Sequence, residues 1–270
     1  MKRIGFTLIE LIVVLVIIAI LIAITLPCLQ SFRQQAKTVL CASNIRQLTL
    51  GLLMYETENR TLPYAVDDHI PQNPPPDGYS GNAAYDRMGW WWFNYISDYS
   101  PKDKKEKRLR WCPSRQLKDS KFKDNVLYGN YGVNRSVCKV YKSLQSSKKW
   151  AEFTGTPLCT KDMQNANKTL LIVDCGYSMI TCWHATDIPP VTFDKNSIED
   201  TVSAYVPGLR INDKRSLWPG QEEDAINGRH PGKTINAGFA DGHISRKKAD
   251  DLLVEKTNDG YKNRGPLWVP

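Results

Sequence analysis

The chain begins with an apolar segment close to the length of a membrane-spanning helix. From Ile4 to Leu29 the only charged residue is Glu10, and the run from Leu11 to Leu26 consists largely of Ile, Val and Leu. About 20 apolar residues are needed to cross a bilayer as a helix. The segment therefore predicts a secretory signal peptide, a plain membrane anchor, or a segment that does both jobs in sequence.

The residues on either side of the apolar run help to separate these alternatives. The run ends in TLPCLQSF, without the small residues of a signal peptidase site, so removal after the run is disfavoured. A plain anchor explains Lys2 and Arg3 as a cytoplasmic flank. It does not explain Glu10, because an ionisable residue costs on the order of 2.5–3.5 kcal/mol at the centre of a bilayer and usually has a function there.

Glu10 has one local explanation, which is a capping box. In TLIE, the Thr7 hydroxyl can accept a hydrogen bond from the Glu10 amide, while the Glu10 carboxylate accepts one from the Thr7 amide. Capping uses only part of the acceptor capacity of a carboxylate. A second role for Glu10 is therefore compatible with it.

The N-terminal sequence also resembles a known family. KRIGFTLIELIVVLVIIAILIAITLP contains a short basic leader, a Gly, Phe-Thr-Leu-Ile-Glu and a long apolar helix, and it is similar to the class III signal of type IV prepilins and type II secretion pseudopilins. The resemblance implies that a prepilin peptidase cleaves between Gly5 and Phe6 and methylates the new amino terminus. It also implies that the Glu10 carboxylate pairs with the terminal ammonium of Phe6 between filament subunits, where either charge alone would be costly.

Pro27 also fits this resemblance, because a proline at this distance from the cleavage site is common in these helices. It lacks an amide proton and clashes with the preceding turn, which predicts a kink or local melting. The alternative is that Pro27 simply ends the membrane helix.

An apolar stripe at helical spacing follows the membrane segment. Its members recur at intervals of 4, 3, 4 and 3 and predict an amphipathic helix that ends at Asn59 or Arg60, before Pro63. One helix from Phe6 to Arg60 would be roughly 80 Å long, at about 1.5 Å per residue. The stripe consists of Cys41, Ile45, Leu48, Leu52 and Tyr55, in which Cys41 is interpreted as buried packing.

The chain is thus expected to contain a leader, one long helix and a globular head. Strands are predicted at 108–112, 125–133, 169–176 and 234–240, with a hairpin whose type I′ turn is formed by Asp241 and Gly242. The predicted fold class is α+β and pilin-like, with the helix packed on an antiparallel sheet. The predicted boundaries are 1–5 for the leader, 6–29 for the transmembrane or filament-core helix, 30–62 for the amphipathic helix and 63–270 for the head.

The segments 36–63 and 227–245 resemble a subgroup of large pseudopilin-like proteins with a C-terminal element that runs from a His to Asp-Gly. Here that element is His230, Asp241, Gly242 and His243, but ten residues separate His230 from Asp241 where the subgroup has nine. A catalytic or metal cluster of His230, Asp241 and His243 is one hypothesis. Asp241 has an independent reason to occupy a turn, and no known catalytic motif is present, so no catalytic residue, cofactor or metal is assigned.

The head contains a run of three tryptophans, Trp90, Trp91 and Trp92. Successive residues cannot share one face of a helix or strand, so at least one indole is expected to be partly exposed. A short helix that plugs the edge of the sheet is the favoured interpretation. A stacking platform for sugars or another flat ligand is the alternative.

The seven cysteines include no CxxC pair, so metal binding through thiolates is not expected. Five of them follow residue 100, and if that part is exported, up to two disulfides could form. The formal net charge is +8, but the Lys and Arg residues are scattered among Asp and Glu, which favours an ordinary solvated surface over binding to nucleic acid.

The expected function is that of a structural subunit of a type IV pilus-like or type II secretion pseudopilus filament. Its expected partners are prepilin peptidase, other pilin or pseudopilin subunits and the bacterial inner membrane, with the N-terminus cytoplasmic and the head outside the cytoplasm. A minor or tip subunit, or a membrane-anchored module that binds glycans or surfaces, is the second hypothesis, and a membrane-tethered enzyme is the third.

Overall fold

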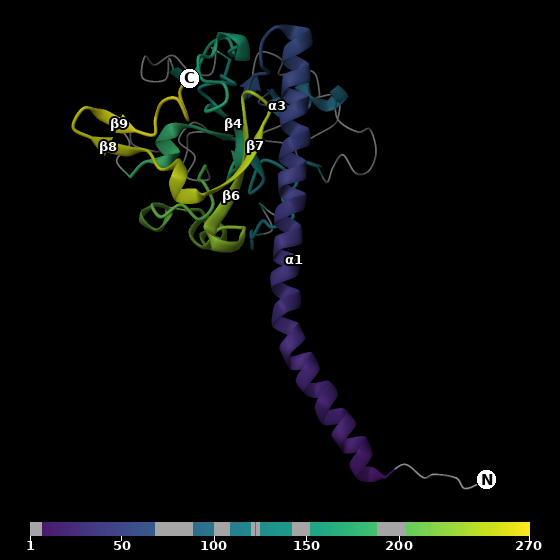
Figure 1. Cartoon of the computed structure of the whole chain (residues 1–270). Helices are drawn as coiled ribbons and strands as arrows, with labels where there is room; N and C mark the ends of the chain where they lie inside the picture. The colour runs from purple at the N-terminus through teal and green to yellow at the C-terminus, as the bar shows by residue number, and fades with distance from the viewer. Residues whose placement is uncertain are drawn as a thin grey trace.

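The computed structural model describes residues 7–67, 89–99, 109–119, 122, 125–141, 152–187, 204–215 and 217–270. In these residues one long helix, α1 (Leu8–Asn59), runs along one side of a head and extends far beyond it (Figure 1). The predicted cleavage residues Gly5 and Phe6 lie outside the described residues. The long helix on a mixed sheet confirms the predicted α+β, pilin-like fold class.

Helix α1 is continuous over 52 residues, and both of its ends are capped. Thr7 and Glu10 form the predicted capping box at the start. At the other end Arg60 has a positive φ of 64°, and its N–H donates to the Glu56 carbonyl. Pro27 lies inside the helix, so the alternative in which it ends the helix is wrong. The N-terminal half of α1 curves away from the axis of the C-terminal half (Figure 1).

The C-terminal half of α1 buries one face against the head. Cys41, Ile45, Leu48 and Leu52 are at most 1% exposed, whereas Tyr55 is half-buried. The predicted stripe therefore faces the core. This burial provides most of the stability of the helix, because amphipathic helices in water depend on tertiary packing more than on propensity.

The head is built on a five-stranded sheet with the order β5-β3-β4-β6-β7. Neighbouring strands are antiparallel, except that β3 and β5 are parallel, so the prediction of a purely antiparallel sheet is wrong. The chain leaves the end of β4, passes the start of β3 and continues along its other side. The strands are β3 (Tyr131–Asn134), β4 (Leu170–Asp174), β5 (Met179–Ile180), β6 (Thr234–Phe239) and β7 (Ile244–Lys248).

Gly132 allows the crossing from β4 to β5. A Cβ at this position would lie 2.5 Å from the Tyr177 carbonyl oxygen and 2.9 Å from Cys175 Cβ. Only a residue without a side chain lets these backbones approach so closely. The parallel pairing of β3 and β5 thus depends on Gly132. The pattern of apolar residues in the sequence does not reveal this role.

Smaller elements complete the described head. Two antiparallel ribbons pair β1 (Val66–Asp67) with β2 (Trp90–Trp91), and β8 (Glu255–Thr257) with β9 (Gly260–Lys262). Helix α3 (Trp92–Tyr95) follows β2 directly. The remaining turns are the 3₁₀ helices η1 (Ser97–Tyr99), η4 (Thr160–Asp162), η5 (Cys182–Ala185), η6 (Asn212–Lys214), η8 (Pro231–Lys233) and η9 (Ala249–Leu252), and the π-helix η7 (Glu223–Asn227).

Two of the predicted strands are wrong in whole or in part. In the predicted strand 108–112, the described residues 109–112 form a turn. Of 125–133, only the part from Tyr131 onward is a strand, because asparagine side chains bond to the local backbone. Asn125 Oδ1 accepts from the Leu127 N–H at 3.0 Å, and Asn130 Nδ2 donates to two local carbonyls at 2.9 Å. Such bonds compete with a sheet ladder.

The predicted hairpin forms between β6 and β7, but its turn is not type I′. The Gly242 N–H donates to the Phe239 carbonyl at 2.9 Å, and Gly242 has a positive φ of 92°. Asp241 does not have a positive φ, as a type I′ turn would require. The aspartate instead accepts a hydrogen bond from the His243 N–H at 3.1 Å.

Helix α1 packs across the sheet on β4, β6 and β7 (Figure 1). At the crossing, Gly238 of β6 faces Thr49 of α1, and a Cβ there would overlap the Thr49 hydroxyl. The glycine therefore sets how closely the helix approaches the sheet.

Candidate functional site

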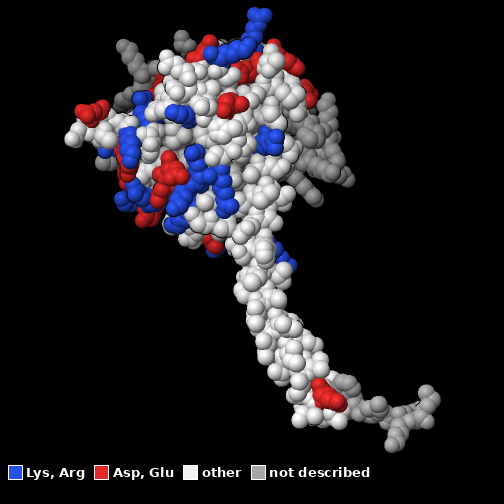
Figure 2. All heavy atoms as spheres, in the orientation of Figure 1, with Lys and Arg blue, Asp and Glu red and all other residues white. Residues whose placement is uncertain are grey.

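The N-terminal part of α1, from Leu8 to Phe32, is here called the stem. Its large apolar side chains are 45–77% exposed, and an 18-residue window in α1 with high hydropathy is 0% buried. By length and composition α1 can cross a membrane. Figure 2 shows the stem as an almost uniformly uncharged rod below a head with mixed charges.

Glu10 lies at the free end of the stem and contacts Thr7. Its Oε2 accepts from the Thr7 N–H at 2.9 Å and from the Thr7 hydroxyl at 2.7 Å, and the Glu10 N–H donates to Thr7 Oγ1 at 3.3 Å. These bonds confirm the local capping role. They leave Oε1 of the carboxylate available to a group from another molecule.

The predicted C-terminal element is divided between the two ends of β6. His230 precedes the strand, whereas Asp241 and His243 follow it, and six residues of extended chain span roughly 20 Å. Asp241 Oδ1 accepts from His243 Nδ1 at 2.6 Å on the exposed turn, and the His243 ring stacks on Phe239. The hypothesis that His230, Asp241 and His243 form a single cluster is therefore wrong.

His230 instead lies in a buried set with Cys41, Cys112 and Asp174, here called the CCDH cluster. Its Nε2 lies 3.1 Å from Asp174 Oδ2, and Cys41 Sγ donates to Asp174 Oδ1 at 3.0 Å. The two sulfur atoms are 3.8 Å apart. All four ligand atoms lie within 4.8 Å of one another, so Cys41 is more than the packing residue that its position on the stripe predicted.

The electrostatics of the CCDH cluster reflect burial opposed by close partners. Burial lowers the pKa of His230, but the adjacent Asp174 carboxylate and Cys112 together raise it more, to about 9. Burial raises the pKa of Cys112, but hydrogen bonds with Cys41 and His230 lower it more, to about 6. Burial and the neighbouring Cys112 raise the pKa of Cys41.

Two of the three tryptophans belong to the core. Trp91 and Trp92 are at most 2% exposed, and Trp92 Nε1 donates to the Ser178 carbonyl at 2.8 Å. Trp91 packs edge-on against Tyr177. Trp90 is half-buried, as expected for at least one of the three. Trp91 and Trp92 are therefore packing residues, but only Trp92 lies in a short helix, because Trp90 and Trp91 form strand β2.

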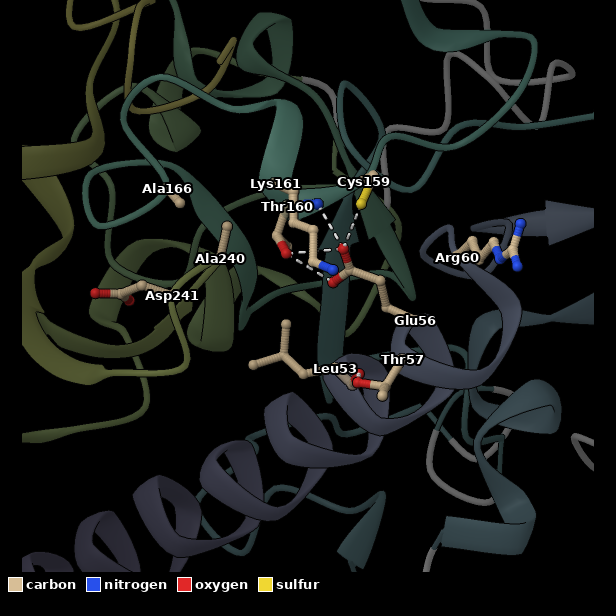
Figure 3. A pocket seen from close by; sticks show the side chains of 10 residues that line it. All are labelled: Leu53, Glu56, Thr57, Arg60, Cys159, Thr160, Lys161, Ala166, Ala240 and Asp241. Atoms are coloured by element: carbon tan, nitrogen blue, oxygen red, sulfur yellow. Dashed lines mark hydrogen bonds between the residues drawn. The ribbon is translucent and has the colours of Figure 1, made fainter.

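A surface hollow of about 750 Å³ lies between α1 and the segment around η4 (Figure 3). Its most buried charged residue is Glu56, which sequence reasoning missed because it lies just beyond the last residue of the apolar stripe. Glu56 Oε1 accepts from the Thr160 N–H at 2.6 Å and from Cys159 Sγ at 3.0 Å. Asp241 points away from Glu56 on the far side of the hollow (Figure 3). Glu56 thus ties the end of α1 to the head and does not converge with Asp241 on a ligand.

Two comparisons with known proteins bear on the family of this chain. Residues 1–26 match the family described as the prokaryotic N-terminal methylation motif. The chain is also 41% identical over 96 residues to the type II secretion system core protein G of Pseudomonas aeruginosa, an alignment that covers 32% of this chain and 68% of that protein. The chain belongs to the prepilin and pseudopilin family. No solved structure matches it.

The family match of this chain includes Gly5, Phe6 and Glu10, and ends one residue before Pro27. The relationship points to a structural subunit and not to an enzyme. The exposed stem suits anchoring by a single helix in the inner membrane. About two thirds of this chain lies outside the alignment with protein G, so the relationship identifies the class of protein but not what the head contacts.

Proposed function

We propose that this chain is cleaved between Gly5 and Phe6 by prepilin peptidase, methylated on Phe6, and assembled through its stem into a filament. The filament would be a type IV pilus-like or type II secretion pseudopilus fibre in which the chain is a structural subunit. The observation that carries this proposal is the exposed apolar stem, which extends from a head that does not cover it.

The physical reason is the cost of leaving the stem in water. Burying one Leu, Ile or Val side chain stabilises by roughly 1.5–3 kcal/mol, and the stem consists mostly of these residues. A bilayer would bury the apolar side chains of the stem before assembly, and the stems of neighbouring subunits would bury them in a filament. The head would meanwhile remain in water, because its own apolar residues are packed inside it.

Glu10 would supply the specific contact in this assembly. Its capping bonds use Oε2, so Oε1 can meet the terminal ammonium of Phe6 on a neighbouring subunit. Pairing compensates the desolvation of both charges among apolar helices. Lys2 and Arg3 would hold the leader on the cytoplasmic side before cleavage, with the inner membrane around the stem and the head outside the cytoplasm.

The assembly role of Glu10 is tested by comparing Glu10→Gln with Thr7→Ala. The first removes the charge, and the second removes the capping hydroxyl but keeps the carboxylate. We expect Glu10→Gln to enter sheared filament fractions at a small fraction of the parent level and Thr7→Ala to enter them readily, with both chains present in membranes. Equal incorporation of Glu10→Gln and the parent would contradict the assembly role, and equal loss in both variants would indicate a capping role only.

The second candidate, a tip subunit or glycan-binding module, rested on the three tryptophans as a stacking platform. Trp91 and Trp92 are buried, which leaves only the half-buried Trp90 of the proposed platform. The enzyme hypothesis required His230, Asp241 and His243 to lie close together. Strand β6 separates His230 from the other two residues, so they do not form one site. The structural subunit is therefore the function with the best support.

A further inference from the structure

The CCDH cluster joins four separate segments of the chain under α1. Cys41 comes from the helix, Cys112 from the turn that replaces a predicted strand, Asp174 from the end of β4, and His230 from the residue before η8. All four are at most 4% exposed. In the described part of the chain, no other group of three or more such side chains converges in this way.

The distances in the CCDH cluster suit a tetrahedral ion. With metal–sulfur bonds of about 2.3 Å, two thiolates of a tetrahedral zinc site lie roughly 3.8 Å apart, and the Cys41 and Cys112 sulfur atoms are separated by 3.8 Å. Sulfur–oxygen and nitrogen–oxygen edges in such a site are roughly 3.3–3.5 Å. Asp174 reaches both neighbours at similar distances through different oxygens, with Oδ1 3.0 Å from Cys41 Sγ and Oδ2 3.1 Å from His230 Nε2, so ligation by one oxygen would require the carboxylate to shift.

Neighbouring groups orient His230 and Asp174 for this geometry. The Thr38 hydroxyl donates to the Gln34 carbonyl at 2.9 Å, so its oxygen can accept from His230 Nδ1–H at 3.1 Å. That bond directs Nε2 into the cluster. The Asn236 N–H donates to Asp174 Oδ2 at 2.7 Å and fixes the carboxylate. Hydrogen bonds of this kind from outside the ligand set are typical of protein metal sites.

We propose that Cys41, Cys112, Asp174 and His230 form a structural zinc site that fastens α1 to the sheet. Two thiolates, one imidazole and one carboxylate are ligands of zinc, whereas calcium and magnesium prefer oxygen ligands alone. Four protein ligands without an open position characterise a structural and not a catalytic site. The proposal revises the expectation that no metal is bound, and it does not depend on filament assembly.

Binding would replace protons that now occupy the cluster. Cys41 would lose its thiol proton and the protonated His230 its Nε2 proton when they ligate, Cys112 would bind as a thiolate, and the ion would take the place of the hydrogen bonds between them. A hollow of about 560 Å³, lined in part by His230, Ser114 and Gln34, lies beside the cluster. Since Cys41 belongs to α1 and the other ligands to the head, the ion would resist separation of the helix from the sheet.

The first test is the metal content of the full chain, purified from membranes in mild detergent without a polyhistidine tag. We expect about one zinc per chain by plasma mass spectrometry. Cys112→Ser should lose most of it. Cys138→Ser should keep it, because Cys138 is a buried cysteine of the same core that is not part of the cluster.

Cobalt substitution and thiol alkylation make the test independent of whether a variant folds. Cobalt in the parent chain should give the visible absorption of a tetrahedral thiolate site, and Cys41 and Cys112 should become alkylated only after a chelator is added. A folded parent chain without zinc would overturn the proposal. So would a Cys41–Cys112 disulfide, because oxidised sulfurs are not thiolate ligands, or zinc content unchanged in Cys112→Ser.

Discussion

Two glycines at the helix–sheet interface should respond in opposite ways to the same substitution. Gly238 of β6 lies against α1, where an added Cβ would overlap Thr49 Oγ1 and would lie 2.9 Å from Ile172 Cγ2. The Thr49 hydroxyl is held by a bond of 2.8 Å to the Ile45 carbonyl, so it cannot easily move. Overpacking of this kind costs about 1–3 kcal/mol.

Gly51, in contrast, lies inside α1 with helical geometry, and its nearest neighbour would be the end of the Ile96 side chain at 3.4 Å. Alanine should stabilise the helix by up to about 1 kcal/mol, because glycine is unfavourable in a helix interior.

The assay is thermal unfolding of the full chain in mild detergent, followed through the tryptophans of the head. Gly238→Ala should lower Tm by roughly 2 to 12 °C, at 2–4 °C per kcal/mol for a domain of this size. Gly51→Ala should leave Tm unchanged or raise it by a few degrees. If Gly238→Ala were as stable as the parent, the close approach of α1 and β6 at Thr49 would be refuted.

Further predictions concern packing and pH. Leu48→Ala removes a side chain that is 1% exposed and should cost about 2–5 kcal/mol, whereas Leu50→Ala, at 47% exposed, should change the Tm of the solubilised chain little; equal shifts would contradict the assigned helix face. Burial, and then the nearby Arg215 and Arg135, hold the pKa of His184 well below its usual range. Because the unfolded chain then binds the extra proton, stability should fall as pH drops below about 6.5, by up to about 1.4 kcal/mol per pH unit. The difference in Tm between the parent and His184→Asn should therefore narrow from pH 7.5 to pH 5, and a constant difference would refute this role.

Local signals in the sequence predicted the parts of the fold that local chemistry determines. Thr7 and Glu10 indicated the capping box, the apolar stripe indicated the buried face of α1, and Asp241 with Gly242 indicated the hairpin. Each feature involves residues only a few positions apart. The length of the strand predicted at 125–133 was too great for a related reason. The side chains of Asn125 and Asn130 form hydrogen bonds with the local backbone, and these bonds compete with strand pairing despite the high β-propensity of the neighbouring residues.

The buried polar groups could not be predicted in this way. The CCDH cluster brings Cys41 together with residues 71, 133 and 189 positions further along the chain, without any motif spacing. The ion pair between Arg229 and Asp224 is also fully buried at 2.7 Å, although its residues looked like ordinary surface charges. Such contacts follow from the order of strands in the sheet, which alternation of apolar residues does not specify.

The central claim concerns the N-terminus of the mature chain. The most direct measurement is the intact mass and first residue of the protein recovered from membranes of cells that contain an active prepilin peptidase, with a Gly5 variant as the processing control. We predict that the parent chain begins at methylated Phe6 and that the Gly5 variant remains unprocessed. A parent chain that still begins at Met1 in those cells would contradict the proposal and would leave the stem as a simple membrane anchor.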